Sequence, residues 1–450
     1  MSETGNLLSS APARGMRDML PAEVAIRDWA TGVIIRAYER FGFTRIDTPA
    51  MENIALLRRG EGGENLQLIF EVLKRGEKLE RELSAGAVKR DELADLGLRF
   101  DLTVPLVRFY AHNQGSLPNP FKAIQIGNVW RAESPQAGRF RQFTQCDIDT
   151  IGVKSAAAEM ELLQATAEAL LNLSFKDFTI RINDRRVLSS LVESCGFASD
   201  RVAGVFITVD KLDKVGVPGV HNELTSKDHP GEAVSTLTKI LERLQTVSQD
   251  KNAGFEPIKS VLPDSIPTEH FSAIGHIIAA LKQQSEERYK VIFDPTLVRG
   301  MGYYTGPIFE FSAPGYSSSI AGGGRYDKMV GKFSGRDVPA CGCSIGFERI
   351  MAILMEQGFT PPGRVHKTAV IFDQDRDNLE SVIAAAGALR KKLDDHAASS
   401  NGTTRSTVVS SLPRKKEMRK QLDQLVAQGF DSYAVFREGQ ELEVKPLAST

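Results

Sequence analysis

The most informative alternation of hydrophobic and polar positions lies between residues 121 and 152. It predicts two strands joined by a polar loop that is longer than a two-residue hairpin turn. Because side chains alternate between the faces of a strand, the second strand places Phe143, Gln145, Asp147 and Asp149 on one face. An amide and two carboxylates in a row are costly to bury without polar partners. The pattern therefore predicts either a polar ligand on this face or a hairpin whose charged groups stay in water.

The spacing along the second strand fits a small amino acid. Gln145 and Asp149 lie roughly 13 Å apart, at about 3.3 Å per residue. An amino acid about 6 Å long, with a hydrogen bond of about 2.9 Å at each end, spans about 12 Å. Arg131 closes the first strand, and Arg139 and Arg141 open the second. Positive charge therefore flanks the acidic row, as a site joining an anionic phosphate to a cationic amine requires.

The N-terminal part, residues 1–184, alternates helices and strands. Its periodicity predicts a helix from Pro21 to about Arg40, and then a strand that ends at Pro49. The run from 71 to 96 is rich in Lys, Arg and Glu, which predicts a solvated helical insertion. A strand running into a helix follows at 98–113.

Asp101 and Thr103 lie two residues apart where that helix is expected to begin. The side-chain oxygen of either residue could cap the helix, and either could instead contact a substrate. The sequence leaves both interpretations open.

The remaining chain divides into three patterns. Residues 185–289 are helical and amphipathic and carry no motif chemistry, which predicts an inserted helical subdomain. Strand patterns return in residues 290–362, where Arg299 lies beside Gly300, whose bare backbone lets a ligand approach closely. Residues 363–450 alternate short strands with helices, which predicts a small α/β domain.

Composition narrows the class of protein. A length of 450 residues suggests about three domains, and 42% hydrophobic and 25% charged residues are typical of a soluble globular protein. A formal net charge of -1 argues against a uniformly basic nucleic-acid-binding surface, but not against local basic patches. Four scattered cysteines and seven histidines without ligand spacing predict neither a metal site nor a disulfide framework. We expect a cytoplasmic protein, because no signal core and no apolar run of membrane length is present.

Two motifs typical of other enzyme classes are incomplete in this sequence. Gly342, Ser344 and Gly346 satisfy the nucleophile pattern of serine hydrolases, but no suitable acid and histidine follow in the required order. The one Gly-Lys pair, Gly331-Lys332, is not followed by Ser or Thr, so no P-loop exists. We therefore expect any nucleotide to bind through arginines and stacking.

Seven segments, taken in their order, resemble the class II aminoacyl-tRNA synthetases, and specifically the histidyl-tRNA synthetase family. The strand ending at Pro49 resembles the first class II motif, VWRAESPQAGRFRQFTQCDIDTIG the second and PACGCSIGFERI the third. LVRGMGYYTG and AGGGRYD resemble the two histidine-specific motifs, and LRFDLTVP and RINDRRVL match further family segments. The resemblance runs from about Arg14 to Leu354. It implies an α+β fold with the class II antiparallel sheet flanked by helices, the sheet being formed by residues 1–184 and 290–362.

The resemblance also implies how ATP is bound. Arg131 and Arg299 are implied to be catalytic and to grip the α-phosphate, with Arg299 in the place that other class II enzymes give to a metal ion. Charge that develops on phosphoryl oxygens is best met by cations already in place. Phe143 and Arg349 are implied to sandwich the adenine, and Glu133 to contact its exocyclic amine.

The residues implied to bind histidine are Asp101, Leu102, Thr103, Arg131, Gln145, Asp149, Arg299, Tyr303 and Tyr304. Asp101, Thr103 and Gln145 are implied to hold the α-amino group, while Asp149 and Tyr304 read the imidazole. An acceptor at the end of a dry pocket rejects apolar side chains, because it would be left unpaired.

Further implied contacts concern RNA. Gln136 and Arg139 are implied to face the acceptor end of a tRNA. Residues 363–450 resemble the family's anticodon-binding domain only in outline. Their basic cluster either lies in water or contacts RNA phosphates, and it consists of Arg414, Lys415, Lys416, Arg419 and Lys420.

The activity implied by the resemblance is that of an ATP-dependent ligase. It would activate L-histidine with ATP to histidyl-adenylate and pyrophosphate, and then transfer histidine to the 3′ end of tRNA(His). The resemblance implies ATP with Mg²⁺ as a substrate, no tightly bound cofactor, no membrane, and a homodimer with the Pro49 strand at its interface.

Two alternatives stay open. One is a non-catalytic, synthetase-like regulatory subunit of ATP phosphoribosyltransferase, although such relatives typically lack the C-terminal domain and part of the ATP-gripping set. The other is an RNA-binding or sensor protein that keeps the fold but does not charge tRNA.

Overall fold

The computed structural model describes residues 9–60, 66–84, 89, 92–134, 140–248, 254–299, 302–316, 318–362, 365–399 and 407–447. The chain divides into two compact units, Met1–Gly358 and Phe359–Thr450. Within the described residues, the larger unit contains an eight-stranded and a three-stranded sheet, and the smaller unit contains a four-stranded sheet.

The eight-stranded sheet organises the larger unit. Its strand order in the described residues is β1-β5-β6-β11-β10-β9-β7-β8. The outer pairs β1–β5 and β7–β8 are parallel, and the pairs between them are antiparallel. The strands are β1 (Thr44–Arg45), β5 (Phe121–Trp130), β6 (Gln142–Ile151), β7 (Thr179–Asp184), β8 (Lys290–Phe293), β9 (Pro307–Ser312), β10 (Ser319–Arg325) and β11 (Ala340–Ile345).

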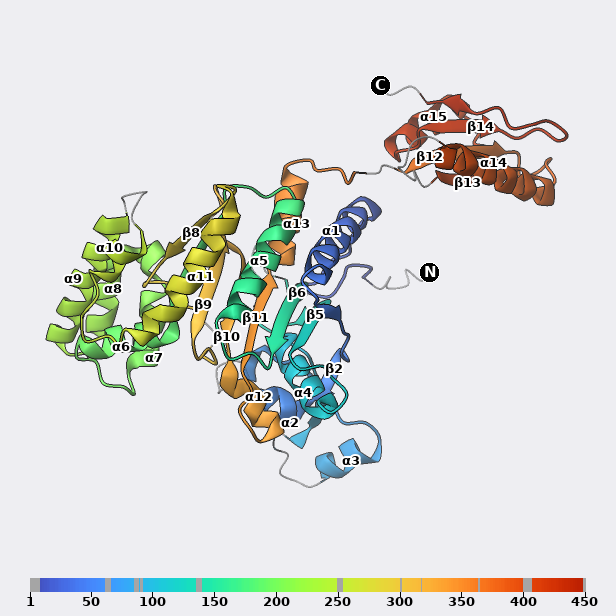
Figure 1. The fold of residues 1–450 in the computed structure, drawn as a ribbon. Coiled ribbons are helices and arrows are strands. Elements are labelled where there is room, and N and C mark those ends of the chain that lie inside the picture. The colour runs from blue at the N-terminus through green and yellow to red at the C-terminus, as the bar shows by residue number, and fades with distance from the viewer. Residues whose placement is uncertain are drawn as a thin grey trace. The chain divides into compact units, whose positions relative to one another are not determined.

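Three helices cover one face of this sheet. They are α1 (Pro21–Glu39), α5 (Ala157–Asn172) and α11 (Glu269–Ser285), and Figure 1 shows α5 and α11 lying across the strands. Apolar strand side chains such as Cys146 and Ile148 are fully buried, as are Leu162 and Leu163 of α5. Every second side chain of the strands and one face of α5 thus form a single apolar layer.

The other elements of the larger unit surround the opposite face and the sheet edges. The three-stranded sheet pairs β4 (Ala94–Leu98) with β2 (Met51–Asn53) and with β3 (Glu71–Leu73). The remaining helices near the sheet are α2 (Ile54–Gly60), the 3-10 turn η1 (Leu66–Leu68), α3 (Glu77–Ser84), α4 (Thr103–Asn113), α12 (Asp327–Ser334) and α13 (Phe347–Glu356).

Two secondary-structure predictions are wrong in part. The segment 71–96 was expected to be helical because it is highly charged. Among its described residues, however, only those of α3 form an α-helix, and the segment begins in β3 and ends in β4. Strand pairing decides the structure here, since Ala94 is buried and a Cβ on Gly97 would lie 2.9 Å from Leu57 Cδ1. The strand expected to end at Pro49 is limited to β1, and β2 begins only after that proline, which has no N–H to donate to a ladder.

The helical pattern predicted for residues 185–289 is observed, but α11 packs on the large sheet, and the helices before it form a separate group. Figure 1 shows this group gathered at one end of the larger unit, beyond α11. Leu188, Phe206, Val220 and Leu241 are buried within it. Its helices are α6 (Arg185–Ser194), α7 (Val202–Val209), α8 (Leu212–Ser226), α9 (Gly231–Ser248) and α10 (Phe255–Lys259).

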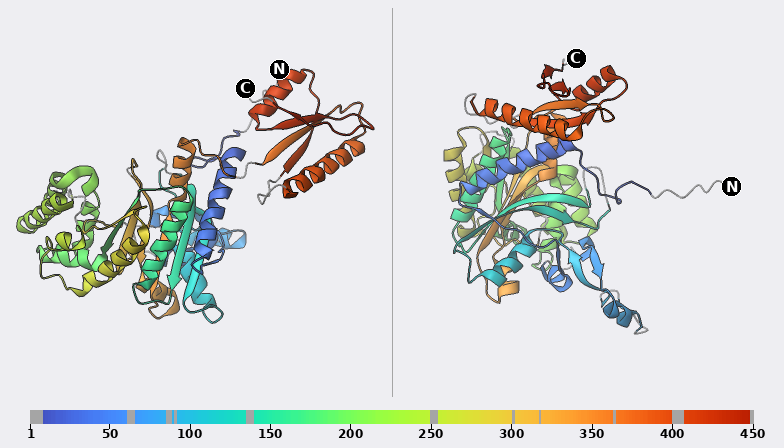
Figure 2. Two further views of the ribbon diagram at one scale, coloured as in Figure 1. Left: turned by 45° about the horizontal axis from the view of Figure 1, so that its top comes forward. Right: turned by 90° about the vertical axis from the view of Figure 1, so that its right-hand side faces the viewer.

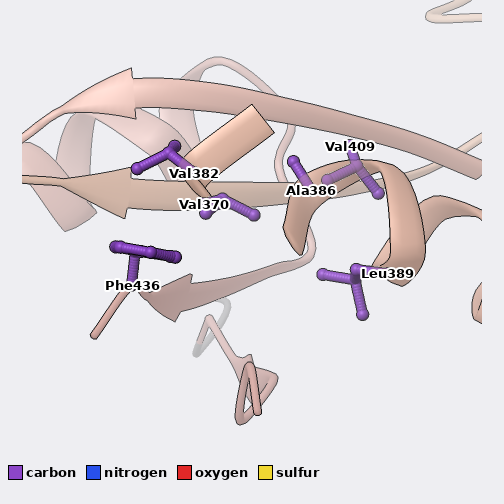
Figure 3. Close-up of a cluster of buried hydrophobic side chains, with 6 residues drawn as sticks. All are labelled: Val370, Val382, Ala386, Leu389, Val409 and Phe436. Atoms are coloured by element: carbon purple, nitrogen blue, oxygen red, sulfur yellow. The ribbon is translucent and has the colours of Figure 1, made fainter. Parts of the chain in front are cut away.

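The smaller unit is a sheet with one helix on each face, and the left view of Figure 2 shows this layering. Alternation along β12 explains it, because Val370 packs with residues of α14 (Leu379–Ser399), while Ala369 and Ile371 pack with Leu425 of α15 (Met418–Ala427). Figure 3 shows the cluster on the α14 side: Val370, Val382, Ala386, Leu389, Val409 and Phe436. The strands are β12 (His366–Phe372), β13 (Thr407–Pro413), β14 (Ser432–Val435) and β15 (Lys445–Pro446).

None of the helices, as far as the described residues go, combines the length and the apolar character that crossing a bilayer requires.

Candidate active site

A cavity of about 440 Å³ opens on the face of the large sheet that the helices α5 and α11 leave uncovered. Phe143, Gln145, Asp147 and Asp149 of β6 all line it, so the face predicted from the alternation in β6 is confirmed. Cys146 and Ile148 point the other way, into the apolar layer. Asp147 was not among the predicted ligand contacts, although the same alternation places it in the row.

Glycines make room for the charged side chains in the cavity. Gly342 of β11 lies directly opposite Asp149 of β6, and a Cβ at Gly342 would overlap the Asp149 Oδ1 atom. Likewise, a Cβ at Gly322 of β10 would lie 2.8 Å from the Arg299 Cζ atom. Only glycine leaves space at these two positions for a carboxylate and a guanidinium that lie against the sheet.

Three buried acceptor atoms in this cavity have no hydrogen-bond partner among the described residues. They are Asp101 Oδ2, Gln145 Oε1 and Asp149 Oδ2. The other oxygens of the two aspartates are occupied, since Asp101 Oδ1 accepts from the Val104 N–H at 3.2 Å and Asp149 Oδ1 accepts from the Tyr326 hydroxyl at 2.5 Å. Asp101 is therefore both a helix cap and an open acceptor. A ligand with several N–H donors and a positive charge would satisfy all three atoms.

Burial raises the pKa values of the carboxyl groups in the cavity, and neighbouring carboxyl groups add to the shift for Asp147 and Asp149. Burial raises the pKa of Asp101 to about 6, despite a hydrogen bond from Val104 and the nearby charge of Arg131. Burial, with the added charge of Asp101, raises the pKa of Asp147 to about 7. The pKa of Asp149 rises well above its ordinary value, because of burial and then the charge of Asp147. A cationic ligand placed among these groups would favour their ionised forms.

Two guanidinium groups reach the same cavity. The Arg131 Cζ atom lies 5.0 Å from the centroid of the Phe143 ring, and Arg131 Nε donates to the Phe100 carbonyl at 3.1 Å. Arg299 Nη1 donates to Glu310 Oε2 at 2.8 Å. These two cations therefore line the same cavity as the open acceptors.

The nucleotide contacts predicted from sequence lie in the same cavity. Glu133 and Arg349 are among its lining residues together with Phe143. Arg349 is exposed at the start of α13 and donates a hydrogen bond to the Ser319 carbonyl oxygen. An aromatic ring and a planar guanidinium on one cavity are suited to stacking on a base.

Tyrosine rings form the wall next to Arg299. The ring centroids of Tyr303 and Tyr304 lie 4.8 Å apart, and those of Tyr303 and Tyr326 lie 5.9 Å apart in an edge-to-face arrangement. A continuing strand would have placed Tyr303 and Tyr304 on opposite faces. Instead the chain turns before β9, and both residues line the cavity.

An ion-pair network that the sequence did not reveal joins α1 to the cavity. Arg27 Nη1 and Nη2 donate to the two carboxylate oxygens of Glu348 at 2.8 and 2.7 Å, and Arg27 Nη2 also donates to Thr144 Oγ1 at 2.8 Å. Glu348 Oε1 accepts in addition from the Thr144 N–H at 3.0 Å. The network fixes the start of α13 against β6, and thereby the position from which Arg349 reaches the cavity.

A row of directly opposite residues crosses seven of the strands. Asp147 pairs with Ser344, Ser344 with Gly322, and Gly322 with Glu310. Sequence reasoning missed this row, because cross-strand register between segments so far apart leaves no local signal. From β5 to β8 its members are Gln125, Asp147, Ser344, Gly322, Glu310, Arg181 and Ile292.

The predicted site residues therefore converge, with three exceptions. Leu102 is buried but does not line the cavity, and its carbonyl accepts from Gln125 Nε2 at 2.9 Å. Gln136 and Arg139 lie outside the described residues. In the part of the chain that the structure describes, no group of three His, Cys, Asp or Glu side chains is placed to hold a metal ion.

Comparison with known proteins gives the family. The family model described as histidyl-tRNA synthetase matches residues 15–350. This chain belongs to the histidyl-tRNA synthetase family. The family model covers every described residue of the cavity, and the resemblance inferred from the seven sequence segments is confirmed.

Relatives of the histidyl-tRNA synthetase family match along nearly the whole chain. A protein named histidine--tRNA ligase from Leifsonia xyli subsp. xyli is 42% identical over 97% of this chain and 98% of that protein. The structure of histidyl-tRNA synthetase from Nostoc sp. PCC 7120 superposes with a TM-score of 0.72 at 24% identity, over 98% of this chain and 95% of that one. The predicted class II α+β fold is confirmed.

A third match bears on one of the alternatives. A Bacillus halodurans structure, described as an ATP phosphoribosyltransferase regulatory subunit/histidyl-tRNA synthetase, has a TM-score of 0.71 at 19% identity, over 96% of this chain and 100% of that one. At this identity the match concerns the fold alone. The choice between ligase and regulatory subunit therefore depends on the residues of the cavity.

Proposed function

We propose that this protein is a histidine–tRNA ligase. It activates L-histidine with ATP to histidyl-adenylate and pyrophosphate, and then transfers histidine to the 3′ end of tRNA(His). One observation carries the proposal beyond family membership: two arginines share one cavity with three acceptor oxygens that have no partner among the described residues. An amino acid brings an ammonium group to the acceptors, and a nucleotide brings its phosphates to the arginines.

In the activation step, a histidine carboxylate oxygen attacks the α-phosphorus of ATP. The bond from that phosphorus to the bridging oxygen breaks, and pyrophosphate leaves. Arg131 and Arg299 meet the charge that builds up on the α-phosphoryl oxygens, because both cations are fixed before the substrate arrives. ATP enters as its magnesium complex, and the ion brings further positive charge to the phosphates.

The polar side chains of the cavity hold the amino acid. Asp101, Thr103 and Gln145 receive the α-ammonium group, whose N–H donors match the open oxygens of Asp101 and Gln145. Asp149 and Tyr304 read the imidazole at the far end. An amino acid with an apolar side chain would leave the Asp149 oxygen unpaired in a buried site, and this gives selectivity.

Other residues of the site bind the nucleotide and the tRNA. Phe143 and Arg349 stack on the two faces of adenine, and Glu133 contacts the exocyclic amine. Gln136 and Arg139 face the acceptor end of the tRNA. In the transfer step, a hydroxyl of the terminal ribose attacks the acyl carbon, and AMP leaves.

The sheet, the inserted helices and the smaller unit have separate tasks in this proposal. Residues 1–184 and 290–362 form the catalytic core, 185–289 the inserted helical subdomain, and 363–450 an anticodon-binding domain. The exposed side chains of Arg414, Lys415 and Lys416 support contact with RNA phosphates.

We also propose that the protein works in the cytoplasm as a homodimer, with the segment around Pro49 at the interface. The three-stranded sheet beside that segment exposes Met51, Leu73 and Leu96, which supports a covering partner.

Histidine-dependent exchange of pyrophosphate into ATP, followed by charging of tRNA(His), tests the proposal. A ligase catalyses both reactions. Exchange without charging would favour the RNA-binding or sensor protein, and the absence of both would favour the regulatory subunit. Asparagine and leucine serve as control substrates, and neither should support exchange.

A further inference from the structure

Arg299 is hydrogen-bonded in the cavity to a carboxylate on β9. Glu310 Oε2 accepts from Arg299 Nη1 at 2.8 Å, and the Arg299 guanidinium lies against Gly322, the residue directly opposite Glu310. The direction in which Arg299 presents its remaining N–H groups therefore depends on how the Glu310 carboxylate is turned.

A second guanidinium lies on the other side of that carboxylate. Arg181 of β7 is the residue directly opposite Glu310 of β9, and Arg181 Nη1 lies 3.7 Å from Glu310 Oε1. The two oxygens of Glu310 thus face two different arginines. The charge of Arg181 favours the orientation of the carboxylate in which Oε2 remains directed at Arg299.

Arg181 is itself held by two further carboxylates. Its Nε donates to Asp294 Oδ2 at 2.5 Å, and its Nη1 donates to Asp213 Oδ2 at 3.0 Å. Asp294 follows β8 and belongs to the sheet, whereas Asp213 lies in the first turn of α8, in the inserted helices. The Asp213 side chain is 70% exposed, while that of Arg181 is 20% exposed.

We propose that Glu310 and Arg181 are positioning residues for Arg299, and that Asp213 makes the inserted helices part of this arrangement. The inference rests on the proposed role of Arg299 at the α-phosphate. The order of contacts is Asp213 to Arg181, Arg181 to Glu310, and Glu310 to Arg299. Fixing α8 against β7 therefore fixes the catalytic guanidinium, although α8 contributes no residue to the cavity.

An ordinary surface ion pair is the alternative for Asp213. Such pairs contribute little to stability and nothing to catalysis. The two cases differ in a measurable way, because a surface pair affects the whole fold weakly, whereas a positioning contact affects the rate of the chemical step.

The first experiment removes the charge of Asp213. In Asp213→Asn, we expect kcat for histidine-dependent pyrophosphate exchange to fall about 3- to 10-fold, with the KM for histidine and the melting temperature unchanged. Glu256→Gln is the matched control, because Glu256 is 76% exposed on α10 and forms a similar surface pair with Lys259 at 3.8 Å. The control should leave kcat unchanged. An Asp213→Asn enzyme with the kcat of the wild type would overturn the proposal.

The second experiment is a double-mutant cycle with Glu310→Gln. In that background the charged link at Glu310 between Arg181 and Arg299 is already removed, so Asp213→Asn should reduce kcat no further. The same fold-reduction in both backgrounds would show that Asp213 acts by another route, and would also overturn the proposal. Absence of exchange in the wild-type protein would refute the proposed function itself. Exchange in the wild type that Asp213→Asn leaves unchanged would refute only the positioning role.

Discussion

The two faces of strand β6 have different roles, although their residues alternate along one strand. On the helix-covered face, Cys146 and Ile148 are fully buried among apolar side chains and stabilise the fold. On the cavity face, Asp147 and Asp149 are just as deeply buried, yet oxygens of Gln145 and Asp149 lack partners. The side chains of the first face are fully packed without a ligand. The open oxygens of the second face gain partners only when a cationic ligand with several N–H donors is bound.

The comparison teaches where stability and function separate in this protein. Burial without a cationic ligand destabilises the ionised forms of these carboxyl groups, and the raised pKa values of Asp147 and Asp149 reflect this cost. The apolar layer one residue away along the same strand offsets it. Substitutions on the cavity face should therefore change binding and catalysis with little effect on stability, and substitutions on the helix-covered face should do the reverse.

The largest effect is expected for Arg299→Ala. Removal of this cation should lower the rate of pyrophosphate exchange by about 1,000-fold or more, because charge on the α-phosphoryl oxygens is no longer met. Histidine binding, measured by calorimetry without ATP, should be largely kept. Loss of histidine affinity as large as the loss of exchange would contradict the role given to Arg299.

The second-largest effect is expected for Gly342→Ala, which should weaken histidine binding. The new Cβ would overlap the Asp149 carboxylate and displace it, so we expect histidine affinity to fall by at least about 100-fold. Gly204→Ala is the control, because Gly204 in α7 has no neighbouring atom within 4 Å of an added Cβ. The control should bind histidine normally and gain about 0.5 to 1 kcal/mol in unfolding free energy.

A pair of substitutions in β6 tests the comparison of its two faces directly. Asp149→Asn keeps the size of the side chain but places an N–H donor where the imidazole needs an acceptor, so histidine affinity should fall about 30-fold with little change in stability. Ile148→Ala should lower the unfolding free energy by about 2 to 5 kcal/mol and leave histidine affinity unchanged. Calorimetry would measure the histidine affinity of both variants, and urea unfolding would measure their stability. Similar stability losses in the two variants would contradict it.

The smallest effect is expected in the pH dependence of stability. The pKa of Asp147 rises from 3.8 to about 7 in the folded protein, which therefore binds more protons than the unfolded chain in this window. The stability from this group is fully present below the unfolded pKa and is lost as the pH rises through the folded pKa. Urea unfolding at pH 5 and pH 8 should therefore show a smaller loss of stability in Asp147→Asn than in the wild type. Equal losses would indicate that Asp147 is not strained.

Local patterns predicted those parts of the site that lie within one element. The alternation in β6 gave its cavity face, and the periodicity from Pro21 to about Arg40 gave α1. Motif resemblance then brought Arg131, Arg299 and Tyr304 into one cavity, as the structure has them. These predictions succeed because strand alternation and motif spacing are properties of short segments.

Contacts that depend on the pairing of distant segments could not be predicted. Nothing near Glu310 in the sequence indicates that it pairs with both Arg299 and Arg181, and Arg27 and Glu348 lie 321 residues apart. The helical prediction for residues 71–96 failed for the same reason. Its charge pattern is that of a helix, but β3 and β4 gain more from pairing with each other than the local sequence reveals.

The cross-strand row from Gln125 to Ile292 ties catalytic competence to correct strand alignment. If β6 or β9 slipped by one residue, the carboxylate that it contributes to the row would turn to the helix-covered face, and an apolar side chain would take its place. Such misaligned molecules would bury charge in the apolar layer and would be unstable. The charged residues of the row therefore also select the correct strand alignment during folding, and partially active misfolded forms should not accumulate.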